Sequence, residues 1–115
     1  RVEPEVAFLM KAPLAGKVTA AAALAAVEAI APAMEIIDSR YENFKFALED
    51  VIADNTSSSG LVIGSWHDPR IDFSNLGVIL EIDGEVVQVG STAAILGHPI
   101  RSLVAAARLV AEAGE

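Results

Sequence analysis

The pattern of apolar and polar positions at the start of the chain predicts a strand. Val2–Met10 is rich in apolar, aromatic and β-branched side chains, and a segment containing proline and glycine follows it. Successive side chains of a strand point to opposite faces, so Glu3 and Glu5 are expected on the same face. Pro4 lacks the N–H that a central strand needs, which indicates an edge strand or the start of one.

Four later segments also have the pattern of strands. The clearest pair is Val78–Ile82 and Glu85–Val89, which flank Asp83-Gly84. An Asp-Gly pair between two apolar runs is a strong signal for a tight hairpin turn. The other two predicted strands are Met34–Arg40 and Leu61–Trp66.

The first half of the chain also contains helical signals. Thr19 can cap a helix over Ala20–Ile30, and Pro32 is expected to prevent its continuation. In Tyr41–Asn55, apolar residues recur at helical spacing, which predicts a helix over part of this segment or an irregular turn.

The C-terminal third predicts two more helices. Ser91 is placed to cap a short helix over Thr92–Leu96, and Pro99 suits the first turn of a last helix that runs to about Ala113. Helices and strands do not alternate regularly enough for a doubly wound sheet. The predicted fold class is therefore a single α+β unit whose strands are mixed or mostly antiparallel.

The bulk properties of the chain exclude several classes of protein. Its 115 residues suit one domain, and its 53% hydrophobic content gives a mean hydropathy of +0.47. No apolar stretch approaches the ~20 residues that span a bilayer. The net charge of −8 argues against binding to nucleic acid or to anionic membranes. The absence of cysteine excludes disulfides, thiolate catalysis and cysteine-ligated zinc.

The two ends of the sequence carry their own signals. No signal peptide is visible, which favours the cytoplasm. The first residues already form a predicted strand, and the last residues follow an alanine-rich helix with no closing strand. We therefore expect residues 1–115 to be a portion of a longer protein.

Three glutamates on the predicted strands are candidate metal ligands. Glu3 and Glu5 share a face of a mostly apolar strand, where their charges repel each other unless a cation lies between them. Glu35 raises the same question on the second strand, and three carboxylates suit Mg²⁺ or Mn²⁺. The alternative is a solvated strand face on which Glu35 pairs with Arg40 or a lysine. Spacing alone favours that alternative.

Other polar residues give weaker signals. The loop Asp54–Gly60 could present hydroxyl and N–H groups to a substrate carboxylate, although surface loops of this composition are common. Asp38-Ser39-Arg40, at a strand end, is more typical of an ion pair or a cap than of a reactive site.

The two histidines suggest no active site. His67 follows Trp66 in a predicted surface loop, and His98 lies at a helix junction between Gly97 and Pro99. Two widely separated histidines do not suggest a zinc site. The sequence also has no Gly-x-Ser-x-Gly elbow and no glycine-rich phosphate loop, so nothing indicates a serine hydrolase, a nucleotide or a flavin.

Five ordered segments together resemble the hydratase/decarboxylase branch of the fumarylacetoacetate hydrolase superfamily. They are spread over essentially the whole chain: Val2–Phe8, Met34–Arg40, Ala53–Ser58, Gly84–Val87 and Ala94–Pro99. Five matches in the same order are far more specific than any one of them.

The resemblance implies a metal site and a substrate contact. In that family, the two glutamates of the first segment and the glutamate of the second bind Mg²⁺ or Mn²⁺, and these positions are Glu3, Glu5 and Glu35 here. The first serine of the family's D-N-x-S loop contacts substrate, and it corresponds to Ser57. The resemblance thus favours the metal interpretation of the three glutamates.

The resemblance also implies a fold that this chain covers only in part. The family has a mixed, mostly antiparallel, barrel-like sheet with flanking helices, and residues 1–115 would be its metal-binding middle. The family's catalytic lysine and aspartate lie outside this chain, since Lys11, Lys17 and Lys45 do not match that lysine. We therefore expect little turnover from these residues alone.

The implied activity is that of a lyase. Ser39–Phe46 and Lys11–Leu14 are more similar to the decarboxylases, which implies Mg²⁺-dependent decarboxylation of 2-oxo-3-hexenedioate to 2-hydroxypenta-2,4-dienoate in the catabolism of aromatic compounds. Hydration of 2-hydroxypenta-2,4-dienoate is the alternative, because the same chelation of substrate by metal serves both reactions. A non-catalytic assembly partner is a second alternative. The implied partners are a small unsaturated 2-oxo acid and other subunits, in a homo-oligomer or a hydratase–decarboxylase complex.

Overall fold

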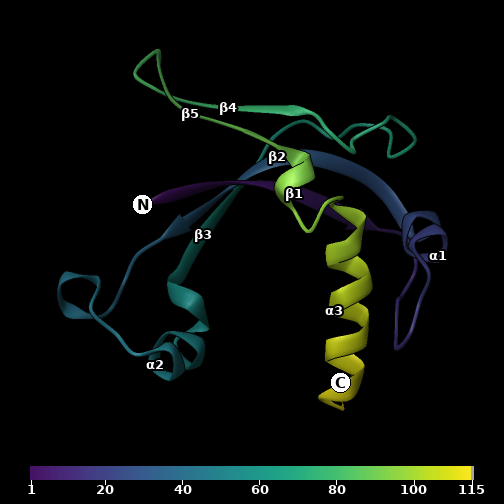
Figure 1. The fold of residues 1–115 in the computed structure, drawn as a ribbon, viewed down its shortest axis with the longest axis horizontal. Helices are drawn as coiled ribbons and strands as arrows, with labels where there is room; N and C mark the ends of the chain where they lie inside the picture. The colour runs from purple at the N-terminus through teal and green to yellow at the C-terminus, as the bar shows by residue number, and fades with distance from the viewer. Residues whose placement is uncertain (115) are drawn as a thin grey trace.

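The computed structural model describes residues 1–114 and contains antiparallel strands with few helices (Figure 1). The strands are β1 (Val2–Met10), β2 (Val27–Ile37), β3 (Ser58–Ile63), β4 (Gly77–Ile82) and β5 (Glu85–Ser91). The α-helices are α1 (Ala20–Ala25), α2 (Leu48–Ala53) and α3 (Ile100–Glu112). Short 3₁₀ turns cover Glu42–Phe44, Asn55–Ser57 and Thr92–Ala94. The α+β class predicted from the sequence is confirmed.

The larger sheet has the order β1-β2-β3, with both pairs antiparallel. β1 is an edge strand and spans the predicted residues Val2–Met10, so the interpretation of Pro4 as an edge-strand residue is confirmed. The β4–β5 hairpin forms a separate two-stranded sheet. Figure 1 shows this hairpin on one side of the larger sheet, with α2 and α3 extending from the other side.

The helix predicted over Ala20–Ile30 is wrong beyond Ala25. Thr19 does cap it, since its Oγ1 accepts a hydrogen bond from the N–H of Ala22 at 3.1 Å, but β2 already begins at Val27. Pairing with β1, together with the bridge between Ile30 and His67, decides the outcome, and Val27 and Ile30 are buried in this arrangement. Local preference is a weak guide where tertiary packing provides such burial.

Pro32 lies inside β2 and does not end the preceding element as predicted. Its carbonyl oxygen accepts a hydrogen bond from the N–H of Gly64 at 2.8 Å. In an antiparallel strand, the N–H and the C=O of one residue point toward the same neighbouring strand. The N–H that Pro32 lacks would therefore point toward Gly64, just beyond the end of β3 at Ile63. The predicted strand Met34–Arg40 is thus the second half of a longer strand that ends at Ile37.

The third strand lies three residues earlier than predicted. The sequence predicted a strand over Leu61–Trp66, whereas β3 covers Ser58–Ile63. The strand therefore includes the end of the predicted polar loop Asp54–Gly60. Pairing explains the shift, because Ser58 and Gly60 are opposite Ile37 and Ile36 of β2.

Two of the C-terminal predictions, the hairpin and the last helix, are confirmed. The hairpin turns at Asp83 and Gly84, with φ of 53° and 80°, as a two-residue turn of this type requires. Ser91 Oγ accepts a hydrogen bond from the N–H of Ala93 at 3.0 Å, although the capped element is a 3₁₀ turn and shorter than predicted. Pro99 immediately precedes α3.

A small core joins α1, β2 and α3. Its buried members are Ala23, Val27, Ile30, Phe73 and Ile100. The Phe73 ring packs edge-on against Phe8 at 6.2 Å and His98 at 5.1 Å between centroids. No helix among residues 1–114 has the length and apolar character needed to cross a membrane.

Candidate metal centre

Three glutamate side chains converge on one face of the larger sheet. Glu3 and Glu5 share a face of β1, and the antiparallel register sets Glu35 of β2 directly opposite Glu3. One carboxylate oxygen from each residue lies within 4.8 Å of the others. The predicted common face of Glu3 and Glu5 is therefore confirmed, and the strand register adds Glu35.

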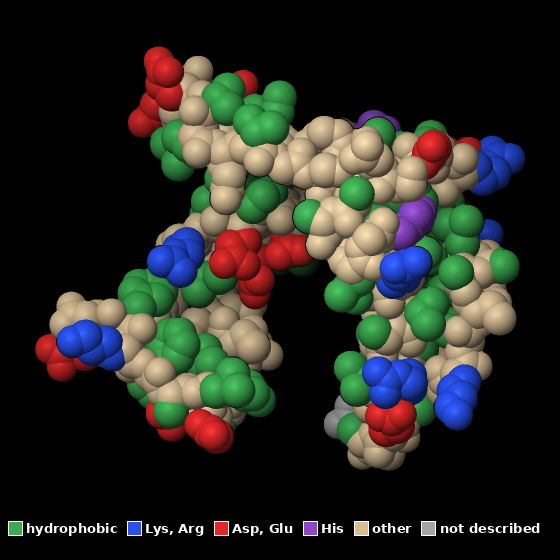
Figure 2. Space-filling view, viewed as in Figure 1, with side chains coloured by type: hydrophobic (Ala, Val, Ile, Leu, Met, Phe, Trp, Pro, Cys, Tyr) green, Lys and Arg blue, Asp and Glu red, His purple; other side chains and the backbone are tan. Residues whose placement is uncertain are grey.

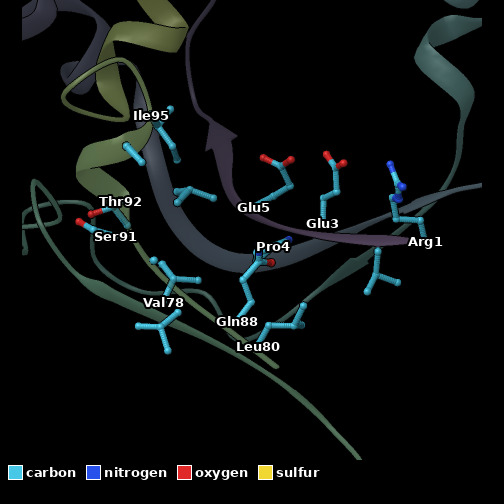
Figure 3. A pocket seen from close by; sticks show the side chains of 15 residues that line it. Arg1, Glu3, Pro4, Glu5, Val78, Leu80, Gln88, Ser91, Thr92 and Ile95 are labelled. Atoms are coloured by element: carbon cyan, nitrogen blue, oxygen red, sulfur yellow. The ribbon is translucent and has the colours of Figure 1, made fainter. Parts of the chain in front are cut away.

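The two faces of β1 have different environments. Figure 3 shows Glu3 and Glu5 projecting to one side of the strand, whereas Pro4 projects to the other, toward Leu80 and Gln88 of the hairpin. On the space-filling surface, acidic side chains gather near the middle of the molecule, between the parts of the chain that carry α2 and α3 (Figure 2). The hairpin thus covers the apolar face of β1 and leaves the carboxylate face open.

The electrostatics of this cluster are unfavourable without a cation. Glu5 is exposed on the surface, but its partial desolvation first, and then the negative charges of Glu35 and Glu3, raise its pKa above the ordinary value. None of the three ion pairs among residues 1–114 includes a member of the cluster. The alternative in which Glu35 pairs with Arg40 is wrong, because Arg40 pairs with Asp54.

The donor set fits a hard divalent cation. Mg²⁺ and Mn²⁺ prefer oxygen ligands, and a few carboxylates leave the remaining coordination positions for water or a substrate. Glu3, Glu5 and Glu35 offer three such carboxylates from paired strands, whose backbone hydrogen bonds hold them at a fixed spacing. Such an ion would supply a positive charge that offsets the repulsion between the three carboxylates.

An open cavity of about 460 Å³ extends from the carboxylates over the same face of the sheet. Glu5 and Glu35 form one end of its lining, and the adjoining wall is apolar, with Ala33 opposite Glu5 and Leu61 opposite Glu35 in the register. Trp66 also lines this cavity. Sequence reasoning did not select Ala33 or Trp66 as site residues, because the β1–β2 register brings Ala33 to Glu5 and the path of the chain after β3 brings Trp66 to the cavity.

Ser57, the predicted substrate contact, lies in a constrained loop. It is only 2% exposed, and its Oγ has no hydrogen-bond partner among residues 1–114. Asn55, Thr56 and Ser57 have φ of 52°, 52° and 62°, and each such non-glycine residue costs roughly 1–3 kcal/mol. Ser57 does not line the cavity beside Glu5, but the next residue, Ser58, does.

Arg40 and the two histidines have the structural roles that the sequence predicted. Arg40 forms the predicted structural ion pair, with Nε 3.0 Å from Asp54 Oδ1. His98 serves the helix junction as predicted, since its Nδ1 accepts a hydrogen bond from the N–H of Ile100 at 3.1 Å. His67 is exposed, and its backbone forms a bridge with Ile30.

Comparison with known proteins gives relatives that align with all or most of the chain. All 115 residues align at 64% identity with a 4-oxalocrotonate decarboxylase from Pseudomonas sp., and 87% of the chain aligns at 39% identity with a 2-hydroxypent-2,4-dienoate hydratase from Pseudomonas putida. The chain is homologous to the 4-oxalocrotonate decarboxylases and, at lower identity, to these hydratases. It spans about 45% of the length of the decarboxylase and 46% of the hydratase. No family model matches it.

A solved structure agrees with this homology. The fold superposes with a TM-score of 0.92 on 4-oxalocrotonate decarboxylase from Pseudomonas putida G7, determined in complex with magnesium and adipate, at 44% identity. The alignment covers 99% of this chain and 44% of that one. The α+β arrangement is thus that of the corresponding part of a decarboxylase.

Proposed function

We propose that this chain is the metal-binding portion of a Mg²⁺-dependent lyase that decarboxylates 2-oxo-3-hexenedioate to 2-hydroxypenta-2,4-dienoate. The observation that carries the proposal is the convergence of Glu3, Glu5 and Glu35 on one face of paired strands, with no ion-pair partner among residues 1–114. The 64% identity to a decarboxylase supports this reaction over the hydratase reaction, whose relative is 39% identical. Mn²⁺ suits the same ligands.

The proposal treats residues 1–115 as one part of a longer catalytic domain. The relatives are more than twice as long as the stretch matched here, which supports this view. We infer that the complete domain has the barrel-like sheet of the fumarylacetoacetate hydrolase superfamily, and that groups for proton transfer come from the rest of the protein. A cytoplasmic location stays a prediction.

Each element of the site has a separate role in this proposal. The β1–β2 register holds the three carboxylates in place, so little reorganisation accompanies ion binding. A bound divalent cation would stabilise negative charge that develops on the 2-oxo oxygen of the substrate. The Ser57 hydroxyl would donate a hydrogen bond to the substrate, and the apolar wall formed by Ala33, Leu61 and Trp66 would limit access of water.

Hydration of 2-hydroxypenta-2,4-dienoate is the second candidate function. The alignment with a hydratase over 87% of the chain favours it, and the same carboxylates would serve it. The proposed protein partners are copies of this chain or a cooperating lyase. Apolar side chains on the hairpin support such assembly, since Ile79 of β4 is 62% exposed and Val89 of β5 is 71% exposed.

The decisive experiment supplies the two substrates separately to the full-length protein with Mg²⁺. We expect CO₂ release from 2-oxo-3-hexenedioate, no hydration of 2-hydroxypenta-2,4-dienoate, and loss of activity with a chelator. Glu35→Gln should be inactive, whereas Glu85→Gln, on the exposed hairpin, serves as the matched control. Hydration without CO₂ release would reverse the order of the two candidates. Turnover that survives both the chelator and Glu35→Gln would contradict the metal site itself.

A further inference from the structure

The Arg40 side chain joins two segments that are separate in the sequence. Its Nε donates to Asp54 Oδ1 at 3.0 Å and its Nη2 to the Asp54 carbonyl at 3.2 Å. Its Nη1 donates to the carbonyl oxygens of Asp38 at 3.1 Å and Ser58 at 3.4 Å. One guanidinium thus connects the residues after β2 with both ends of the segment Asn55–Ser57.

That segment has little reason to keep its conformation unaided. Three successive residues without glycine, Asn55, Thr56 and Ser57, have positive φ, a region that L-residues normally avoid. The N–H of Ser57 donates to the Asp54 carbonyl, and the Ser57 carbonyl accepts from the N–H of Asp38, each at 3.0 Å. Both contacts lie among the groups that Arg40 joins.

The conformation has a specific consequence for Ser57. Its hydroxyl is buried but has no hydrogen-bond partner among residues 1–114, an arrangement that disfavours folding. Avoided backbone conformations cluster at active sites and ligand clamps, and a catalytic or binding role is one explanation for a buried polar group without a partner. Asp54 Oδ2, on the carboxylate that Arg40 holds, is also buried without a partner in this part of the chain.

We propose that Arg40 is a positioning residue, which holds Asn55–Ser57 in this conformation and so directs the Ser57 hydroxyl, without a partner among residues 1–114, to the substrate. The inference rests on the proposed function, in which Ser57 contacts the substrate. Arg40 itself touches no member of the glutamate cluster through a hydrogen bond or ion pair that the structure of residues 1–114 shows. Its removal should therefore affect the use of substrate and leave the binding of metal nearly unchanged.

The test compares Arg40→Met, Ser57→Ala and the double variant in the full-length protein, with 2-oxo-3-hexenedioate and Mg²⁺. If Arg40 acts through Ser57, each single variant lowers kcat/KM by about tenfold, and the double variant loses no more than either one. The Mg²⁺ dissociation constant, measured by calorimetry, should change less than about threefold. Arg40→Lys should recover part of the activity, because an ammonium group pairs with Asp54 but cannot reach four oxygens as a fork.

Arg108→Met provides the matched control. Arg108 also forms an ion pair, with Glu112 on α3, and its side chain is 47% exposed against 48% for Arg40. The Arg108→Met variant should leave kcat/KM and the affinity for Mg²⁺ unchanged. Asp54→Asn is a milder second variant, which keeps an acceptor for Arg40 but removes the charge. It serves if Arg40→Met does not fold, and its kcat/KM should fall in the same direction.

Hydrogen–deuterium exchange gives a readout that does not depend on turnover. In Arg40→Met, the amides of Asp38 and Ser57 should exchange faster than in the wild type, while the β4–β5 hairpin stays unchanged. Unchanged exchange at these amides, or losses that multiply in the double variant, would overturn the role of Arg40. A wild type inactive on both substrates would instead refute the proposed function, and the exchange result would still decide whether Arg40 holds the loop.

Discussion

Glu3 of β1 and Glu35 of β2 face each other directly across an antiparallel strand pair. Like charges in opposite positions on adjacent strands destabilise a sheet. Glu5, two residues from Glu3, adds a third carboxylate to the same small region. This arrangement has a cost for the metal-free protein, and a divalent cation between the carboxylates would reverse it.

Removing one carboxylate of the opposed pair should remove the response to metal. Wild-type protein should be stabilised by Mg²⁺ or Mn²⁺, because ligands that bind only the folded state raise its melting temperature. Glu35→Gln should weaken binding by at least about tenfold, since it replaces one of three charged ligands. Titration calorimetry and thermal melts with and without metal measure both effects. The same weakening in Glu85→Gln would show that net charge, and not this cluster, controls the affinity.

Glu5 should destabilise the metal-free protein at neutral pH. Its pKa is raised above the ordinary 4.5 by burial, then by Glu35 and Glu3, so folding favours the protonated form. That stabilising contribution is fully present below pH 4.5 and is lost as the pH rises through the folded pKa. Glu5→Gln should therefore raise the metal-free melting temperature at pH 7 and have little effect below pH 4.5.

Two further measurements complete the test on Glu5. The same substitution should abolish stabilisation by Mg²⁺, because it removes a proposed ligand. Glu81→Gln, at an exposed position on β4, is the control and should change neither quantity. A lower melting temperature for metal-free Glu5→Gln at pH 7 would mean that the carboxylate has a stabilising partner.

Local chemistry explains which parts of the fold the sequence could predict. The hairpin was predictable because Asp83-Gly84 encodes its own turn, and β1 because its end and its edge position are marked by nearby prolines and glycine. The boundary between α1 and β2 was not predictable, since Ala20–Ala33 contains many alanines, which suit a helix locally. Pairing with β1 along most of its length, and with β3 from Ala33 onward, makes Val27–Ile37 extended.

The candidate site shows the same division. The spacing of Glu3 and Glu5 was enough to place both on one face, because side chains alternate along any strand. The position of Glu35 opposite Glu3 depends on register between distant segments, which spacing does not contain. The Arg40–Asp54 pair depends similarly on how the chain returns after β2, so its partner could not be read from the sequence.

The hairpin turn should depend on the backbone freedom of Gly84. With φ of 80° and no atom within 4 Å of an added Cβ, Gly84→Ala would meet no steric contact, and its cost would come from the backbone alone. We expect a loss of about 1 kcal/mol in the free energy of unfolding, measured with urea. Gly90→Ala is the matched control, since Gly90 has equal space but no positive φ. Equal losses in both variants would assign the effect to the strands instead of the turn.

Thr92 should stabilise the junction between the hairpin and the segment that precedes it. Its Oγ1 accepts a hydrogen bond from the N–H of Leu76 and donates one to the Phe73 carbonyl, both at 2.8 Å, and the residue is 4% exposed. Thr92→Val has nearly the same shape but leaves both backbone groups without this partner. The expected loss is about 1–3 kcal/mol in the free energy of unfolding.

Thr92→Ser separates the hydrogen bonds from the packing at this position. It keeps the hydroxyl and loses one methyl group, so its expected cost is about 0.8 kcal/mol. Urea unfolding of both variants against the wild type measures the difference. If Thr92→Ser is as destabilising as Thr92→Val, the methyl group carries the stability, and the two hydrogen bonds of Oγ1 contribute little. If Thr92→Val alone is strongly destabilising, the hydroxyl fixes Phe73 and Leu76 against the end of β5, and thereby the position of the hairpin over β1.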